Sequence, residues 1–403
     1  NNTAGNENVA IGTAVLYNNT TGSNNVAIGT GTMQTNTTGV KNVAVGNNSL
    51  FRNTIGQRNI AIGELALYEN TTASYNIAIG MSSLYKNTTG QFNIGIGYQA
   101  LEDNTIGQFN VGMGYQAMLQ NTTGQANVAI GNTALRQNTI GYENVAVGAS
   151  ALRNNTTGSN NVAIGTSTLF DNTTGIRNVA IGTSALTDNT SGTENVGIGH
   201  EVLFKNTFGE KNVSTGNKSL YTNTTGSKNV ALGFQAMYAN TAGNDNIGIG
   251  SEALTSNTTG FSNTAVGKEA LKSLVTGNFN TAVGTQALKN IGAGISYATA
   301  MGFAAAENTT ASHVTAVGYH SLKQNLSGAN NTAAGDSSLK RNTTGGANTA
   351  IGAFALEDNT TGTDNTAVGH LAGGANIVGR FNTFIGKAAG LVSTDSNNTF
   401  IGA

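Results

Sequence analysis

The chain has 403 residues, of which 10% are charged, and its 19 Lys and Arg residues nearly balance its 20 Asp and Glu residues. A nucleic acid or an anionic membrane surface needs a basic footprint on its partner, and this composition excludes one. Cysteine is absent, which excludes disulfides and thiolate metal sites, and no apolar stretch is long enough to cross a bilayer.

The first repeat begins at Asn8 with Asn-Val-Ala-Ile-Gly, and this motif recurs every 17 residues. The period runs without a slip to Asn280 and resumes at Asn331. With degenerate copies at Ala298 and Val314, the chain holds 24 copies. A strict short period is typical of a solenoid, in which each copy is one structural unit stacked on its neighbours.

Each copy follows the consensus Asn-Val-Ala-Ile-Gly-x-x-Ala-Leu-x-x-Asn-Thr-Thr-Gly-x-x, whose residues we number as repeat positions 1 to 17. The alternation of Val or Ile with Ala at positions 2 to 4 predicts a short strand, for example at residues 60–62. The Ala-Leu pair at positions 8 and 9 predicts a second short strand. Gly or Asn-Thr interrupts every few residues, which disfavours a helix. We therefore expect an all-β, parallel β-solenoid (a β-roll) of about 24 coils.

The glycines at positions 5 and 15, such as Gly63 and Gly56, predict turns with positive φ or a close backbone approach. Ala73 replaces one position-15 glycine, so that turn tolerates a Cβ atom. Stacked coils place each Asn about 4.8 Å from its equivalent in the next coil, which predicts side-chain hydrogen-bond ladders. We interpret the recurrent Asn, Thr and Gly residues as scaffold.

Two changes along the chain divide the repeat. Position 2 is Val or Ile up to Ile247 and Thr from Thr264 onward. This switch predicts a boundary between Asn-Val/Ile-Ala-Ile-Gly coils in residues 1–262 and Asn-Thr-Ala-Val-Gly coils in residues 263–403. An irregular stretch at 285–313 has spacings of 18 and 16 residues, which together equal two repeats. We predict a local bulge or loop there and no domain break.

Energetics favour assembly. Burying a large apolar side chain contributes roughly 1.5–3 kcal/mol, whereas ordering each backbone residue costs roughly 1–2 kcal/mol. A lone coil therefore cannot fold, and a single stacked chain has a thin core. The small residue at position 3, such as Ala27 or Gly95, keeps one strand face flat. Several chains could pack on that face, and this possibility, together with the resemblance described next, predicts a homotrimer.

The copies resemble the Asn-Thr-Thr-Gly-x-x-Asn-Val-Ala-Ile-Gly-x-x-Ala-Leu repeats of phage tail fibres and bacterial surface proteins, which are related to the heads of trimeric autotransporter adhesins. The late copy at 382–390 is similar to copies that precede an endosialidase-type chaperone. The resemblance covers essentially the whole chain. It implies a trimeric, left-handed β-roll with a role in adhesion or host recognition, extracellular, on a virion tail fibre or a bacterial cell surface. Both chain ends fall inside a repeat, so we expect a piece of a longer protein.

Aromatic residues recur at three variable repeat positions, and these columns are the candidate binding surface. They occupy positions 17, 10 and 6, respectively: Tyr75, Phe92 and Phe109; Phe51, Tyr68 and Tyr85; Tyr98 and Tyr115. Stacked rings along a fibre could bind a cell-surface glycan or receptor. Rings at coil spacing could equally stack on each other or fill a groove between chains.

The expected function is a non-enzymatic fibre shaft for adhesion or host recognition, with no catalytic site, metal or cofactor. The four histidines are scattered, and Asp and Glu occupy variable positions. A secreted filament coated with glycans is an alternative, because many turns match the Asn-x-Thr acceptor. The candidate acceptors are Asn19, Asn36, Asn70, Asn87 and Asn121. Ice binding through Thr is a further alternative. We expect the chain to associate with copies of itself and with a glycan or receptor. We expect no nucleic-acid partner and no membrane insertion of this segment.

Overall fold

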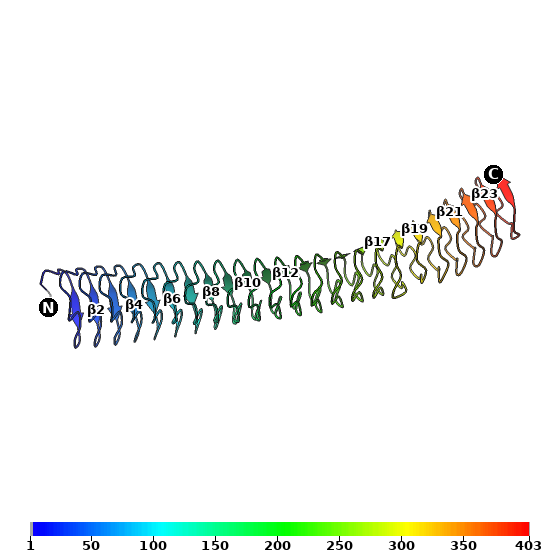
Figure 1. Ribbon diagram of the computed structural model, residues 1–403. Coiled ribbons are helices and arrows are strands. Elements are labelled where there is room, and N and C mark those ends of the chain that lie inside the picture. The colour runs from blue at the N-terminus through cyan, green and yellow to red at the C-terminus, as the bar shows by residue number, and fades with distance from the viewer. Residues whose placement is uncertain (1–2, 403) are drawn as a thin grey trace. The chain divides into compact units, whose positions relative to one another are not determined.

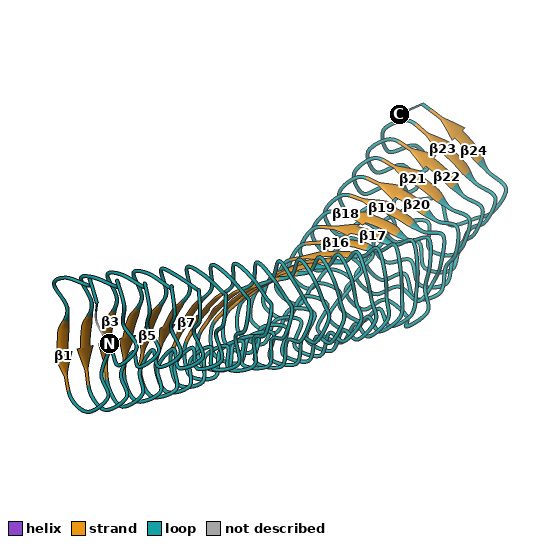
Figure 2. Ribbon diagram, turned by 60° about the vertical axis from the view of Figure 1, so that its left-hand side comes forward, coloured by secondary structure: helices purple, strands orange, loops and turns teal. Residues whose placement is uncertain are grey.

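The computed structural model describes residues 3–402, and its contacts divide the chain into two compact units, Asn1–Glu201 and Val202–Ala403. Across the described residues every regular element is a three-residue strand, with one strand in each repeat and no helix. Within each unit the strands lie side by side on one face, and turns complete each coil (Figures 1 and 2). The prediction of an all-β parallel β-solenoid is confirmed.

Successive strands of the first unit pair in parallel and in register, so that Val9 lies opposite Val26 and each residue opposes its equivalent 17 positions later. The strands of this unit are β1 (Val9–Ile11), β2 (Val26–Ile28), β3 (Val43–Val45), β4 (Ile60–Ile62), β5 (Ile77–Ile79), β6 (Ile94–Ile96), β7 (Val111–Met113), β8 (Val128–Ile130), β9 (Val145–Val147), β10 (Val162–Ile164), β11 (Val179–Ile181) and β12 (Val196–Ile198). A constant repeat length makes this register the natural one, because it stacks identical side chains.

The second unit is built in the same way, and its register persists through the change from Ile to Thr, where Ile247 pairs with Thr264. Its strands are β13 (Val213–Thr215), β14 (Val230–Leu232), β15 (Ile247–Ile249), β16 (Thr264–Val266), β17 (Thr281–Val283), β18 (Thr299–Met301), β19 (Thr315–Val317), β20 (Thr332–Ala334), β21 (Thr349–Ile351), β22 (Thr366–Val368), β23 (Thr383–Ile385) and β24 (Thr399–Ile401). Thr299 pairs with Thr281 and Thr315, so the 18- and 16-residue spacings leave the strand register intact.

The strands turn their small residue inward. From the second to the penultimate strand the position-3 residue, such as Ala61, is buried, whereas Ile60 and Ile62 are partly exposed. A Cβ atom added to Gly112 would lie 3.1 Å from Cγ of Leu101, so the buried Leu at position 9 fills the space behind the strand. The expectation that the small residues form an outer packing face is therefore wrong, because only a small side chain fits between the strand and this leucine.

The second predicted strand, at positions 8 and 9, is absent from the described residues and is replaced by a turn. Leu65 and Leu67, at positions 7 and 9, have φ values of 59° and 52°. Left-handed backbone costs an L-residue roughly 1–2 kcal/mol. Burial of the Leu67 side chain and the hydrogen bond from its N–H to the Ser83 carbonyl of the next coil, at 3.0 Å, offset this cost.

Two buried ladders of asparagine side chains run beside the leucines, as predicted. At position 12, Nδ2 of Asn104 donates to Oδ1 of Asn87 at 2.8 Å and to the Gly107 carbonyl at 3.1 Å. At position 1, Oδ1 of Asn76 accepts from the backbone N–H of Asn93, whose Nδ2 also donates to the Gly107 carbonyl. Where both asparagines are present, the carbonyl of the turn glycine thus accepts from two side-chain amides of its own coil.

The two glycine columns are favoured for different reasons, and Ala73 shows that position 15 can also hold a Cβ atom. Gly97, at position 5, has a φ of 132°, which L side chains rarely adopt, and its equivalents behave likewise. Gly107, at position 15, has no positive φ, but a Cβ atom there would collide with Oδ1 of Asn104 and the carbonyl of Gly124. The structure therefore contains both features anticipated for glycine, each at a separate turn.

Candidate functional site

The position-17 column forms a continuous stack of aromatic rings on the surface of the first unit. The centroids of Tyr75 and Phe92 are 5.0 Å apart, and those of Phe92 and Phe109 are 5.2 Å apart, with interplanar angles of 12° and 2°. Arg58, at the same position of the preceding coil, lies 5.3 Å from the Tyr75 centroid and donates to the Tyr75 hydroxyl at 2.6 Å. Neighbours therefore cover most ring faces, and the ring edges meet solvent.

The other two predicted columns are also brought together. At position 10, Phe51, Tyr68 and Tyr85 stack with centroid separations of 5.1 and 5.3 Å and are half-buried. At position 6, Tyr98 and Tyr115 stack at 5.5 Å. A sugar that binds an aromatic residue lies against the face of the ring, so a stacked column offers free faces only at its ends.

Further ring stacks lie in the second unit, where sequence reasoning did not find them. The sequence did contain a signal for them, because these rings occupy repeat positions 10, 17 and 6, as the rings of the first unit do. The 18- and 16-residue spacings obscure the position-17 set. The stacks are Phe204, Tyr221 and Tyr238; Phe279, Tyr297 and His313; and Phe303 with Tyr319. Aromatic stacking is thus a recurrent surface feature of both units.

The five candidate glycan acceptors belong to the position-12 ladder and are buried: Asn19, Asn36, Asn70, Asn87 and Asn121. Nδ2 of Asn121, for example, donates to Oδ1 of Asn104 at 2.8 Å and to the Gly124 carbonyl at 3.1 Å. The amide nitrogen that would carry the glycan is therefore engaged inside the coil. Attachment there would require the side chain to leave the ladder.

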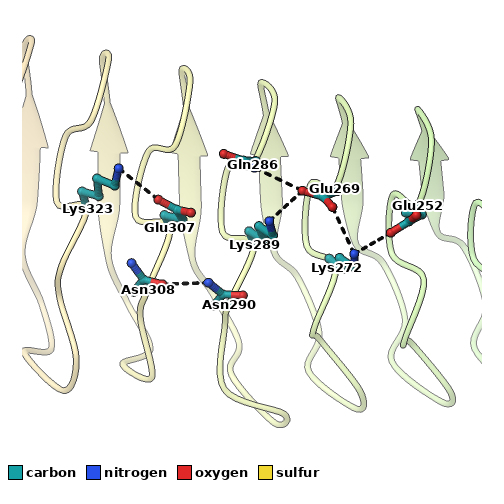
Figure 3. A network of polar contacts seen from close by, with 9 residues as sticks. All are labelled: Glu252, Glu269, Lys272, Gln286, Lys289, Asn290, Glu307, Asn308 and Lys323. Atoms are coloured by element: carbon teal, nitrogen blue, oxygen red, sulfur yellow. Dashed lines mark hydrogen bonds and ion pairs between the residues drawn. The ribbon is translucent and has the colours of Figure 1, made fainter.

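A charged network follows positions 7 and 10 of the second unit (Figure 3). The carboxylate of Glu269 accepts from Lys289 at 2.7 Å, from Lys272 at 3.0 Å and from Gln286 at 3.2 Å, and Lys272 also pairs with Glu252 at 2.5 Å. The hydrogen bonds from Lys289, Lys272 and Gln286 lower the pKa of Glu269 to about 2. These groups satisfy one another across adjacent coils, which indicates a stabilising role.

The network continues along the same face through Lys323 and Glu307, whose charged atoms are 3.3 Å apart, and through an amide hydrogen bond between Asn290 and Asn308 at 2.8 Å (Figure 3). Both pairs lie in or next to the irregular stretch predicted at 285–313. Cross-coil pairing of side chains therefore bridges the place where the repeat length changes.

Three of the four histidines take part in ring contacts, namely His313, His320 and His370. His313 stacks on Tyr297 at 5.2 Å, and His370 meets Phe354 edge-on at 6.0 Å. Burial, together with the positive charges of Lys323 and Lys340, lowers the pKa of His320. Within residues 3–402, no three His, Cys, Asp or Glu side chains gather closely enough to hold a metal ion. The same residues form no helix that could traverse a lipid bilayer.

The outward strand face of the first unit is an uninterrupted apolar strip. Positions 2 and 4 of β1–β12 hold only Val, Ile and Met, and all of these side chains are exposed or half-buried. With strands about 4.8 Å apart, the strip is roughly 50 Å long and 10 Å wide, an area of about 500 Å². A patch of this size lies near the upper end of the roughly 300–600 Å² found on monomeric proteins and commonly marks an interaction site.

Comparison with known proteins adds no functional assignment. No protein-family model matches the chain, and no curated protein matches it.

Proposed function

We propose that the chain is the non-enzymatic shaft of an extracellular fibre, which assembles as a homotrimer and serves adhesion or host recognition on a phage tail fibre or a bacterial surface. The observation that carries the proposal is the apolar strip on β1–β12. Its Val, Ile and Met side chains carry no charge and face outward. Burial of such a strip against other copies would add the apolar contacts that the thin coil interior lacks.

The chemistry of the coil interior supports a structural role. Each coil devotes its buried polar groups to ladders that connect it to the next coil, as the contacts of Asn104 illustrate. The variable residues all lie outside these ladders, where ring stacks and charged pairs occupy the surface. A surface that varies on a constant scaffold suits recognition of a partner better than it suits a precisely arranged catalytic site.

Two alternatives receive less support. A filament coated with glycans at its Asn-Thr-Thr turns would need the acceptor amides at the surface, whereas those of Asn36 and Asn121 are buried. Ice binding through the sheet would favour paired Thr columns. In the second unit Thr264 and its equivalents do line the outward strand face, but the neighbouring outward column is mostly apolar, with Val266 and Val283 as examples.

The proposed assembly is tested by charging the apolar strip. Sedimentation velocity and native mass spectrometry of the wild-type protein should give three times the chain mass of 40.9 kDa. The double variant Ile79→Lys/Ile96→Lys, on adjacent strands β5 and β6, should be monomeric because lysine opposes burial of this face. Circular dichroism would establish that the monomer is folded.

The matched control places the same charges on exposed turn residues of two adjacent coils, those of β4 and β5, as Thr72→Lys/Thr89→Lys, and should remain trimeric. A monomeric wild-type protein, or a trimeric Ile79→Lys/Ile96→Lys variant, would refute this assembly. Adhesion is measured separately as binding of the labelled wild-type protein to bacterial and animal cells, and lack of binding to all of them would refute that part of the proposal.

A further inference from the structure

The position-17 ring stack ends abruptly at Phe109. Its interplanar angle of 2° with Phe92 means that its opposite face is turned toward the next coil, where position 17 is Ala126. Phe109 is 55% exposed, compared with 43% for Phe92, because no ring covers that second face. The following coil carries Glu143 at the same position. A single small residue therefore opens a gap in the column between an aromatic face and a carboxylate.

An open depression of about 330 Å³ adjoins this gap, between the turn of Ala126 and the turn of Glu143. Its lining residues are Thr123, Gln125, Ala126, Ile140, Tyr142 and Glu143. The neighbouring position-16 column changes here as well, from Gln91, Gln108 and Gln125 to Tyr142. Both columns thus break in adjacent coils, and an aromatic side chain, an amide, a hydroxyl and a carboxylate surround the space. We call this depression, together with the free face of Phe109, the notch.

We propose that the notch binds one pyranose ring of a neutral oligosaccharide. The coil spacing supports the fit: Phe109 and Glu143 are two coils apart, roughly 9.6 Å at about 4.8 Å per coil, which leaves room for one sugar ring against the phenyl face. The apolar C–H face of a pyranose would lie on Phe109, an interaction of the same kind as other contacts to aromatic faces. This inference rests on the proposed adhesive function and names its ligand class.

The polar groups of the notch favour a neutral sugar over an acidic one. Glu143 is the charged side chain among the lining residues, and no lysine or arginine accompanies it there. Its carboxylate accepts hydrogen bonds from sugar hydroxyls and repels the carboxylate of sialic or uronic acids. The Gln125 amide and the Thr123 hydroxyl can each donate to and accept from the ligand. Carbohydrate sites combine apolar contact with a few such groups.

The decisive variant fills the gap while preserving the fold. Ala126→Phe continues the ring stack, and it should fold normally because Phe92 and Phe109 already occupy this position with φ values of 58° and 59°, close to the 53° of Ala126. The control is Ala347→Phe, at the same repeat position of the second unit, exposed and with a φ of 56°. Both variants add the same ring, but only the first closes the notch.

The experiment measures binding of the intact protein to an array of neutral hexose and N-acetylhexosamine oligosaccharides printed beside their sialylated counterparts. Wild type and Ala347→Phe should bind neutral members, Ala126→Phe should bind at least 10-fold more weakly, and Glu143→Gln should lose discrimination against the sialylated ones. No binding to any neutral member, or equal binding by Ala126→Phe, would overturn the proposal. Sedimentation of each variant reports trimer assembly independently, so a failed notch and a failed fibre are distinguishable.

Discussion

At the scale of single residues, the unusual feature is how much of the interior is polar. Each regular coil buries two asparagines beside one leucine or methionine and small residues. A buried amide is costly unless it is paired. The ladder shows this dependence where it stops: position 12 changes from Asn257 to Leu274 and then Ile291, and Oδ1 of Asn257 is left without a hydrogen-bond partner. The asparagines therefore stabilise the coil only as an uninterrupted series.

Removing one member from the middle of the series should be correspondingly costly. Asn104→Ala leaves the Oδ1 of Asn87 without its donor, removes one of the two acceptors of the Asn121 Nδ2 and removes one of the two amides that donate to the Gly107 carbonyl. With each unmet buried group costing about 1–3 kcal/mol, we expect a loss of about 3 kcal/mol or more in the free energy of unfolding. Urea denaturation followed by circular dichroism measures it.

The comparison variant is Thr89→Ala, on an exposed turn position one coil earlier. Its stability should stay within about 0.5 kcal/mol of wild type, as is usual for surface substitutions. Equal stability of Asn104→Ala and Thr89→Ala would contradict the importance assigned to the ladder.

At the scale of the element, side chains of neighbouring coils act together. The Glu269 network joins positions 7 and 10 of successive coils, and it lies outside the strands, along the turn (Figure 3). Its members are partly solvated, so each pair contributes at most about 1 kcal/mol. The backbone of this turn is left-handed at positions 7 and 9, a conformation that the Ala-Leu pair and its neighbouring residue types do not predict.

The network predicts a pH dependence. The pKa of Glu269 is about 2 in the folded chain, below its ordinary value of 4.5, so the carboxylate is favoured by folding. Its contribution is fully present above pH 4.5 and is lost as the pH falls through 2. Glu269→Gln should therefore be less stable than wild type at pH 7, by about 1 kcal/mol or less, with the difference disappearing near pH 2.

Urea denaturation at pH 7, 4.5, 3 and 2 measures this difference, and Thr89→Ala again serves as the uncharged reference. A gap between wild type and Glu269→Gln that stays constant from pH 7 to pH 2 would show that the lysines do not stabilise the ionised carboxylate.

At the scale of the whole molecule, a repeat that contacts only its neighbours makes stability nearly a sum over coils. Deleting residues 144–160 of the first unit removes one complete repeat and joins Glu143 to Asn161, which occupies the same position as Asn144. Register and ladders are preserved, so the deletion variant should fold, with a midpoint of thermal unfolding within a few degrees of wild type.

A deletion of residues 144–152 tests the reverse case, because it removes about half a repeat and places Leu and Asn columns out of alignment. This variant should fail to give the wild-type circular dichroism spectrum. A folded half-repeat deletion, or an unfolded full-repeat deletion, would contradict coil-by-coil stacking as the source of stability.

The sequence by itself determined the solenoid, the strand at positions 2 to 4, the parallel register and the asparagine ladders, because a constant period forces equivalent residues to stack. The second strand predicted at positions 8 and 9 is a turn in the structure. Only the tertiary structure decided which way the strands face. Alternation of Ile60, Ala61 and Ile62 is compatible with either orientation. The choice depends on the space left by the position-9 side chain of the preceding coil, as Leu101 limits it at Gly112. The notch beside Ala126 was likewise found only from the structure. Ala126 interrupts the aromatic column in the sequence, but this interruption leaves a free ring face only because Phe92 and Phe109 stack.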